Sequence, residues 1–147
     1  MAKLIVAEPP AAYAQRPLLV VDASVVAAVI FAEKEQDQAL GWMRGRALFA
    51  PQVVDLEITN VALNKLRRKS ARVDTTAAAL AKFAALDLER RPIAIDGVFV
   101  LAVQRNLSAY DAAYLWLAAE LKAPLATFDA RLGAAARSHL ERLGKDT

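Results

Sequence analysis

Two short apolar runs that end in an aspartate constrain the fold of this chain more than any other feature. They are "PLLVVD" at residues 17–22 and "PLATFD" at residues 124–129. "ALFAP" at 47–51 and "RPIAID" at 91–96 have the same character of a short buried strand, and helical patterns separate the four runs. Strands that alternate with helices pair in parallel through right-handed crossovers. The sequence therefore predicts an α/β fold: a three-layer α/β/α sandwich with a central parallel sheet of about four to five strands.

Helices are predicted between and after these strands. The segment 51–73 is predicted as one long helix with Pro51 in its first turn, where a proline is tolerated. The next helix, 74–87, is predicted to be capped by Asp74. The other helical patterns cover residues 23–33, 35–46, 96–106, 130–143 and a segment that begins at Ser108.

Length and composition indicate one folded domain. The 147 residues fit a single domain over 17–147, and residues 1–16 are interpreted as an N-terminal leader or flexible arm. The longest uninterrupted apolar run, at 25–32, is far shorter than the ~20 residues of a membrane span, so no membrane partner is expected. The chain has no cysteine, which excludes disulfides and is compatible with a reducing compartment. A cytoplasmic location is therefore expected.

Catalysis in this chain would have to rest on carboxylates. The single histidine, His139, lies in a helix-like segment near the C-terminus, which argues against a serine–histidine–aspartate site. Asp22 and Asp129 each end a predicted strand, and parallel strands bring their carboxyl ends to one edge of a sheet, where ligands bind. Either aspartate alone could simply cap the following helix. Two of them at one edge favour a functional site.

Asp111 and Glu57 are the other two candidate acids. Asp111 follows Ser108 in the pattern of a capping box, yet it lies about 180° around the helix from Glu120, so it faces the protein if Glu120 faces water. Glu57 shares its side of the long helix with Asn60, which favours a polar seam over a solvated glutamate. An acid that faces inward requires a partner.

Four acids brought together would repel one another strongly. Each pair of carboxylates about 4 Å apart costs on the order of 4 kcal/mol at an effective dielectric constant of about 20. Either some acids stay protonated or a hard divalent cation neutralises them, and carboxylate and water oxygens are the ligands that Mg²⁺ or Mn²⁺ prefers. A metal ion is therefore the candidate reason for acids that interrupt apolar segments.

Four motifs surround these acids. They are "VVDASVV" with Asp22, "LEITNVALNKL" with Glu57, "SAYDAAYLWLAAELKAPL" with Asp111 and "ATFDARL" with Asp129. In this order and spacing they resemble the motifs of PIN-domain ribonucleases of the VapC toxin type, and the resemblance extends from residue 18 to about residue 140. The third motif is the most specific of the four.

The resemblance implies a metal-dependent endoribonuclease that hydrolyses RNA phosphodiester bonds. One or two Mg²⁺ or Mn²⁺ ions per active site are implied. The implied catalytic and metal-binding set is Asp22, Glu57 and Asp111 as core ligands, with Asp129 as a fourth that binds directly or through water. The polar positions that match the surroundings of these acids are Ser24, Asn60 and Thr127. The resemblance also implies the role of a toxin in a VapBC-like toxin–antitoxin pair, with a VapB-like antitoxin whose tail covers the acidic site, and a homodimer.

Basic residues near the end of the Glu57 helix could bind an RNA backbone. They are Lys65, Arg67, Arg68 and Arg72. A solvated helix end, where cations suit the helix dipole, is at least as good an interpretation. The formal net charge of +3 is too small to decide between the two.

Other functions remain open from the sequence. A receiver domain requires an acidic pair after its first strand, where this chain has one acid, and a haloacid-dehalogenase-like phosphatase requires a second aspartate at the position of Ser24. A PIN fold that binds RNA or a partner without cleavage is the main alternative, and a housekeeping nuclease is another. The complete set of four acids argues against the binding module.

Overall fold

The computed structural model describes Ile5, Ala7 and residues 16–145. The strands are β1 (Leu18–Val21), β2 (Ala47–Pro51), β3 (Leu88–Arg91) and β4 (Leu125–Ala126). The helices are α1 (Ala23–Ile30), α2 (Gln36–Met43), α3 (Val54–Arg67), α4 (Val73–Ala85), α5 (Ile95–Arg105), α6 (Ala109–Leu121) and α7 (Ala130–Lys145). The predicted leader, apart from Ile5, Ala7 and Arg16, lies outside the described residues.

The four strands form one parallel sheet in the order β3-β2-β1-β4. Leu18 pairs with Ala47 on one side of β1, and Val20 pairs with Leu125 on the other. The chain therefore moves from β1 to β2 and β3 in one direction and returns to place β4 on the opposite side of β1. The carboxyl ends of β1 and β4 form the switch point where open α/β sheets bind ligands.

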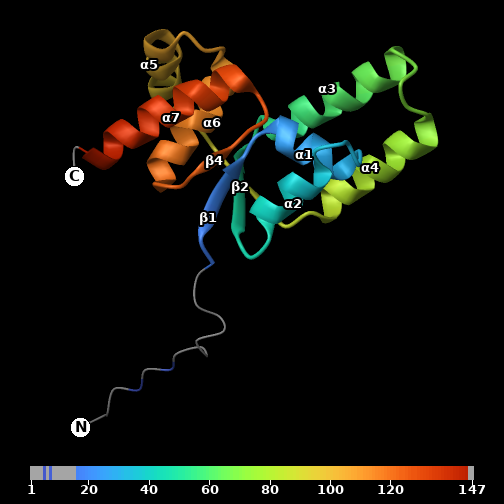
Figure 1. The fold of residues 1–147 in the computed structure, drawn as a ribbon, viewed down its shortest axis with the longest axis horizontal. Coiled ribbons are helices and arrows are strands. Elements are labelled where there is room, and N and C mark those ends of the chain that lie inside the picture. The colour runs from blue at the N-terminus through green and yellow to red at the C-terminus, as the bar shows by residue number, and fades with distance from the viewer. Residues whose placement is uncertain (1–4, 6, 8–15, 146–147) are drawn as a thin grey trace.

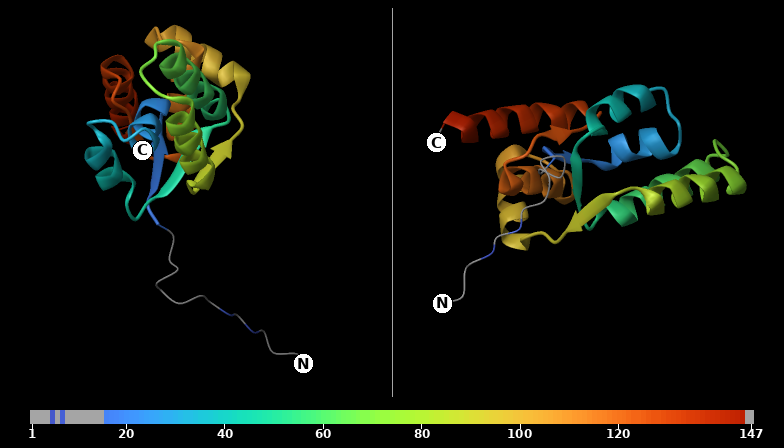
Figure 2. Two further views of the ribbon diagram at one scale, coloured as in Figure 1. Left: turned by 90° about the vertical axis from the view of Figure 1, so that its right-hand side faces the viewer. Right: turned by 90° about the horizontal axis from the view of Figure 1, so that it is seen from below.

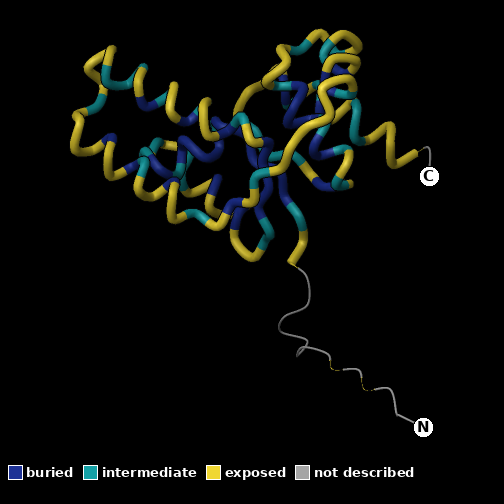
Figure 3. Tube along the Cα trace, turned by 180° about the vertical axis from the view of Figure 1, so that it is seen from behind, coloured by how far each residue is buried: buried dark blue, intermediate teal, exposed yellow. Residues whose placement is uncertain are grey.

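Helices cover the sheet from two sides. In Figure 1, α5, α6 and α7 lie on one side of β1 and β2, and α1 to α4 lie on the other. Helix α6 packs on β1, β2 and β4, and α1 packs on α2, α3 and α4. Leu19, Val20 and Val21 are fully buried, and the buried segments gather around the strands in Figure 3. The predicted three-layer fold with four parallel strands is confirmed.

The predicted helix over 51–73 is wrong at both ends. Pro51 is the last residue of β2, where it pairs with Arg91, and α3 begins only at Val54. At the other end, α3 stops at Arg67 and Lys69 adopts a positive φ of 54°. Pairing between distant strands overrides the local helix signal at the first end. A tight turn separates α3 from α4 at the second.

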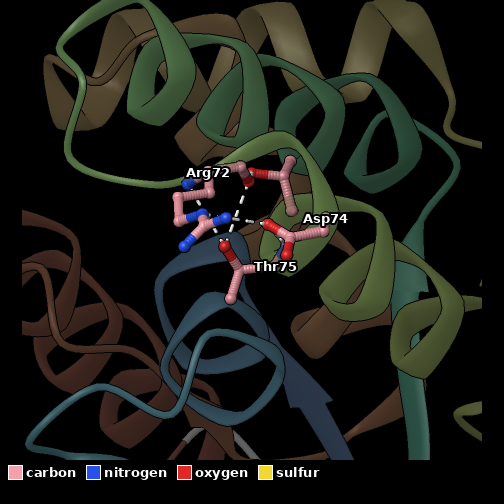
Figure 4. A network of polar contacts seen from close by, with 4 residues as sticks. Arg72, Asp74 and Thr75 are labelled. Carbon is pink, nitrogen blue, oxygen red and sulfur yellow. Dashed lines mark hydrogen bonds and ion pairs between the residues drawn. The ribbon is translucent and has the colours of Figure 1, made fainter.

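Helix α4 begins differently from the prediction that Asp74 caps it. The cap residue is Arg72, whose backbone N–H donates to Thr75 Oγ1 at 3.2 Å (Figure 4). Thr76 Oγ1 donates to the Arg72 carbonyl at 2.8 Å. Asp74 lies in the first turn, where it accepts a hydrogen bond from the Thr75 N–H and pairs with the Arg72 guanidinium at 3.5 Å. An acid in the first turn suits the helix dipole without being the cap.

The third strand lies earlier in the chain than the predicted segment 91–96. It spans Leu88–Arg91 because these residues pair in register with β2, and Leu48 lies opposite Leu88. Pro92 has no N–H to donate to a ladder, and Ile95 already belongs to α5. The fourth strand is shorter than predicted, with only Leu125 and Ala126 paired to β1.

Gly97 in α5 lies against the Trp116 ring of α6. A β-carbon added to Gly97 would lie 2.6 Å from Trp116 Nε1 and 3.1 Å from Cδ1, so the indole ring would have to move. We expect Gly97→Ala to lower the free energy of unfolding by about 1–3 kcal/mol, measured by denaturant unfolding. Gly41→Ala in α2 is the control, because nothing lies within 4 Å of its added carbon, and it should be neutral or stabilising. Equal destabilisation of the two variants would contradict this contact.

Among the described residues, no helix combines the length and the apolar character that a membrane crossing requires.

Candidate active site

Asp22 is the most buried acid of the candidate set. It follows β1 directly and caps α1, where its Oδ1 accepts hydrogen bonds from the Val25 N–H at 3.1 Å and from Ser24 Oγ at 2.6 Å. Its Oδ2 accepts a hydrogen bond from Thr127 Oγ1 at 2.5 Å. The residue is 5% exposed. The Asp22 carboxylate can therefore cap α1 and also belong to the candidate active site, although the sequence left these two roles as alternatives.

The segment after β4 joins the same cluster from the neighbouring strand. The Phe128 N–H donates to Ser24 Oγ at 2.9 Å, and the Asp129 N–H donates to Thr127 Oγ1 at 2.9 Å. Asp129 Oδ1 in turn accepts a hydrogen bond from the Leu132 N–H at 2.8 Å in the first turn of α7. The hydroxyls of Ser24 and Thr127, which the resemblance implied near the acids, thus both contact Asp22, and they connect the end of β1 to the end of β4.

Asp111 enters the site from the first turn of α6. Ser108 caps this helix and its Oγ accepts a hydrogen bond from the Asp111 N–H at 3.1 Å. No hydrogen bond between the Asp111 carboxylate and the Ser108 N–H is found among the described residues, although the Ser108 hydroxyl lies close enough to lower the pKa of this carboxylate. Asp111 is half-buried whereas Glu120 is exposed, as the helical geometry predicted.

Glu57 reaches the site from α3 and meets Tyr114 of α6. Glu57 Oε1 and the Tyr114 hydroxyl are both buried, and among the described residues neither has a partner in good hydrogen-bonding geometry. The two groups are nevertheless close enough for each to shift the pKa of the other. A buried carboxylate oxygen without a firm partner is unusual, because it loses its hydration with no compensation.

The acids act on one another electrostatically. Burial raises the pKa of Asp22 above its usual range despite the hydrogen bonds that it accepts. Burial also raises the pKa of Glu57, and the charges of Asp111 and Asp22 raise it further. The pKa of Asp111 is raised by burial and by the charges of Asp129 and Asp22. Each of the four predicted acids therefore lies close enough to at least one other for their charges to interact.

The side chains of the four acids lie near one another, but they do not surround a common point. Within the described part of the chain, no group of three or more acidic or histidine side chains is close enough together to hold a metal ion as it stands. Mutual repulsion between carboxylates at neutral pH favours such a spread arrangement. The donor set consists of oxygen atoms and includes the unpaired Glu57 Oε1, so its chemistry fits a hard divalent cation.

The predicted polar neighbour Asn60 does not join this cluster. It is exposed and makes no side-chain hydrogen bond among the described residues. The polar seam that the sequence suggested along α3 is therefore not formed by this amide. Sequence reasoning in turn missed Tyr114, although its position three residues after Asp111 places both on one side of α6.

The basic residues predicted to bind RNA lie at the tip of the α3–α4 hairpin, which projects away from the sheet (Figure 2). Lys65 pairs with Glu33 at 3.1 Å and lies over the Phe31 ring, so it has a structural role. Arg72 pairs with Asp74. Arg67 and Arg68 are exposed and make no ion pair among the described residues.

Known proteins resemble this chain in sequence and in fold. The family model for the PIN domain matches residues 19–138. Ribonuclease VapC9 of Mycobacterium tuberculosis is 36% identical, and the match covers 78% of this chain and 88% of VapC9. Ribonuclease VapC3 of Pyrobaculum aerophilum is 30% identical, with 78% of this chain and 91% of VapC3 covered.

Solved structures agree with the fold. A crystal structure of a Pyrobaculum aerophilum protein superposes with a TM-score of 0.63 at 24% identity, over 88% of this chain and 96% of that one. VapC20 of Mycobacterium tuberculosis, a toxin that cleaves the sarcin-ricin loop, superposes with a TM-score of 0.56 at 18% identity, over 80% of this chain and 94% of VapC20. Since the PIN-domain model matches residues 19–138, which is most of the chain, this chain belongs to the PIN-domain family.

Proposed function

We propose that this chain is a metal-dependent endoribonuclease that hydrolyses RNA phosphodiester bonds and acts as the toxin of a VapBC-like pair. The observation that carries the proposal is the set of four acids at the switch point of the sheet, including a buried Glu57 oxygen without a firm partner. RNA as the substrate is supported by relatives that are named ribonucleases.

The residues that would hold Mg²⁺ or Mn²⁺ are Asp22, Glu57 and Asp111, with Asp129 as a further ligand. When bound, a divalent cation supplies Lewis-acid activation of a water nucleophile and neutralises charge on the phosphate. The protein fixes the ligand orientation: Ser24 and Thr127 hold both oxygens of Asp22, and the Leu132 N–H holds one oxygen of Asp129. Loss of such a hydrogen bond to a metal-binding carboxylate typically lowers metal affinity by about 10–100-fold.

The test is cleavage of a structured RNA pool by the purified chain. We expect products with Mg²⁺ or Mn²⁺ and none with a chelator. Binding of RNA without products under any metal condition would favour a PIN fold that binds RNA without cleavage. Cleavage that a chelator does not affect would contradict the proposed chemistry.

A VapB-like antitoxin is the proposed protein partner. A groove of about 1130 Å³ lies between α2, β4 and α7, and it is lined by apolar side chains such as Leu125 and Leu140. The groove extends to Thr127, which bonds Asp22, so an apolar segment in the groove could carry a tail to the acidic site. Co-expression with the product of an adjacent small reading frame should give an inactive complex. The lack of any such neighbour would favour a housekeeping nuclease. For either function, the proposed location is a reducing compartment such as the cytoplasm.

The outer face of α5 supports the proposed homodimer. Ile95, Phe99 and Val103 lie four residues apart on this helix and are 81%, 68% and 67% exposed. An apolar stripe of this kind marks an interaction surface. We expect sedimentation equilibrium to show a dimer at micromolar concentration and Phe99→Glu to give a monomer. Leu56→Glu, at an exposed apolar position of α3, is the control and should stay dimeric. A monomeric wild-type chain would contradict the dimer.

A further inference from the structure

Arg131 is a cation in the first turn of α7, two residues after the acid Asp129. Its Nη2 donates a hydrogen bond to the Asn106 carbonyl at 2.6 Å. Asn106 ends α5 with a positive φ of 53°, and the chain then passes directly to Ser108 and the helix that carries Asp111. The guanidinium therefore joins the start of α7 to the loop before Asp111.

The charge of Arg131 acts on the acidic site without being neutralised by it. Its positive charge lowers the pKa of Asp111, in opposition to the effect of the neighbouring acids. Yet among the described residues Arg131 forms no ion pair within 4.0 Å, and its only side-chain hydrogen bond is the one to Asn106. A guanidinium has five N–H donors, so most of them remain available at the rim of the site.

The position of Arg131 is unfavourable for the helix that carries it. A cation near a helix N-terminus opposes the helix dipole by a few tenths of a kcal/mol up to about 1 kcal/mol. The last turn of α7, by contrast, carries Arg142 and Lys145, where cations are favourable. A residue that violates a local rule beside a functional site is expected to serve that site.

We propose that the free donors of the Arg131 guanidinium bind a phosphate group of the RNA at the acidic site and position it for cleavage. The proposal rests on the proposed function, since it names the substrate of the same site. An RNA phosphate that approaches four acids is repelled by each carboxylate that remains ionised. A guanidinium at the rim supplies planar donors that match two phosphate oxygens. Its hydrogen bond to Asn106 limits the conformational freedom that binding would otherwise remove.

The test measures RNA binding and metal binding separately. The probe is a fluorescein-labelled random-sequence RNA oligonucleotide, and its affinity is measured by anisotropy in the non-cleaving Asp22→Asn background. We expect Arg131→Ala to weaken binding by about tenfold and to reduce the slope of log affinity against log salt by about 0.7, the change for one phosphate contact on a single strand. Arg131→Lys should restore part of the binding. Arg137→Ala is the control on the same helix.

Metal affinity gives the readout that a purely structural role would not produce. Calorimetric titration of Mn²⁺ into the Arg131→Ala chain, with Asp22 intact, should give equal or tighter binding, because a positive charge near Asp111 is removed. RNA affinity should therefore fall in this variant while metal affinity stays the same or rises. A parallel loss of both would mean that Arg131 only holds the loop in place, and RNA binding equal to that of the Arg137→Ala control would equally overturn the proposal. If RNA binding falls as expected while the wild-type chain shows no metal-dependent cleavage, the phosphate site stands and the nuclease proposal fails.

Discussion

The Asp22→Asn variant is expected to lose metal-dependent RNA cleavage, with a rate at least about 100-fold below that of the wild-type chain. Asparagine keeps the size of the side chain, and its amide oxygen can still accept the hydrogen bond from the Val25 N–H. It removes the negative charge that a divalent cation requires. The fold should therefore persist while the activity is lost.

Initial rates on one RNA substrate, measured with saturating Mn²⁺ and with a chelator, check this expectation. Asp37→Asn is the matched control, because Asp37 is an exposed acid of α2 that lies outside the acidic site, and its rate should equal that of the wild type. Circular dichroism of both variants tests whether the fold is kept. Cleavage by Asp22→Asn at the wild-type rate would mean that Asp22 does not take part in the chemistry.

Divalent metal is expected to reverse the effect of Asp111→Asn on stability. Burial and the charges of Asp129 and Asp22 raise the pKa of Asp111, so its ionised carboxylate destabilises the folded chain at neutral pH. In a chelator, Asp111→Asn should therefore raise the free energy of unfolding by about 1–2 kcal/mol, or the Tm by roughly 2–8 °C. Substitutions at functional sites that relieve such repulsion commonly stabilise a protein while they remove its activity.

The sign of the pH dependence follows from the raised pKa. Between the ordinary value of 3.8 and the raised value in the folded chain, the folded state binds more protons than the unfolded state. The stability of the wild-type chain therefore falls as the pH rises through this range, and the full destabilisation is present above the raised pKa. The advantage of Asp111→Asn should accordingly be greatest at neutral pH and should vanish below about pH 3.8.

With bound metal at neutral pH, the wild-type chain should be more stable than Asp111→Asn. A cation present at about 100 times its dissociation constant stabilises the wild-type chain by about 2.7 kcal/mol, and the variant should lose most of this gain. Thermal unfolding in a chelator and in Mn²⁺, with Asp37→Asn as the control, measures both effects. If the same protein, wild type or Asp111→Asn, has the higher Tm both in the chelator and in Mn²⁺, the assignment of Asp111 as a ligand is contradicted.

Much of the fold could be predicted because local sequence patterns indicate most of its strands and helices. The run that ends at Asp22 has the character of a buried strand, and Ser108 stands at a typical capping position; both segments adopt the predicted structure. The alternation of strands and helices predicted the parallel sheet, whereas the strand order β3-β2-β1-β4, and with it the switch point between β1 and β4, is known only from the structure.

The errors arise where long-range pairing decides the structure. Pro51 has a good local position for the start of a helix, yet its pairing with Arg91 keeps it in β2. The same pairing determines that β3 begins at Leu88 and not at Arg91. No local pattern distinguishes these alternatives, because the partner strand lies about 40 residues away in the sequence.

The acids of the candidate site were visible in the sequence, whereas two of their neighbours were not. Tyr114 has the character of a core aromatic residue, and only the structure shows its buried hydroxyl beside Glu57. Arg131 has the character of a solvated helical arginine, and only the structure shows its contact with Asn106 before the helix of Asp111. Both depend on which helices face each other, which the sequence pattern does not specify.

Anomalous diffraction from crystals of the wild-type chain grown with Mn²⁺ would locate the metal ion among the four acids. The proposed metal site requires an anomalous peak bounded by carboxylate oxygens of Asp22, Glu57 and Asp111, with Asp129 beside it, and requires that this peak is lost in crystals of Asp22→Asn. No peak at the carboxyl ends of β1 and β4 at saturating Mn²⁺, or a peak held only by other residues, would contradict it.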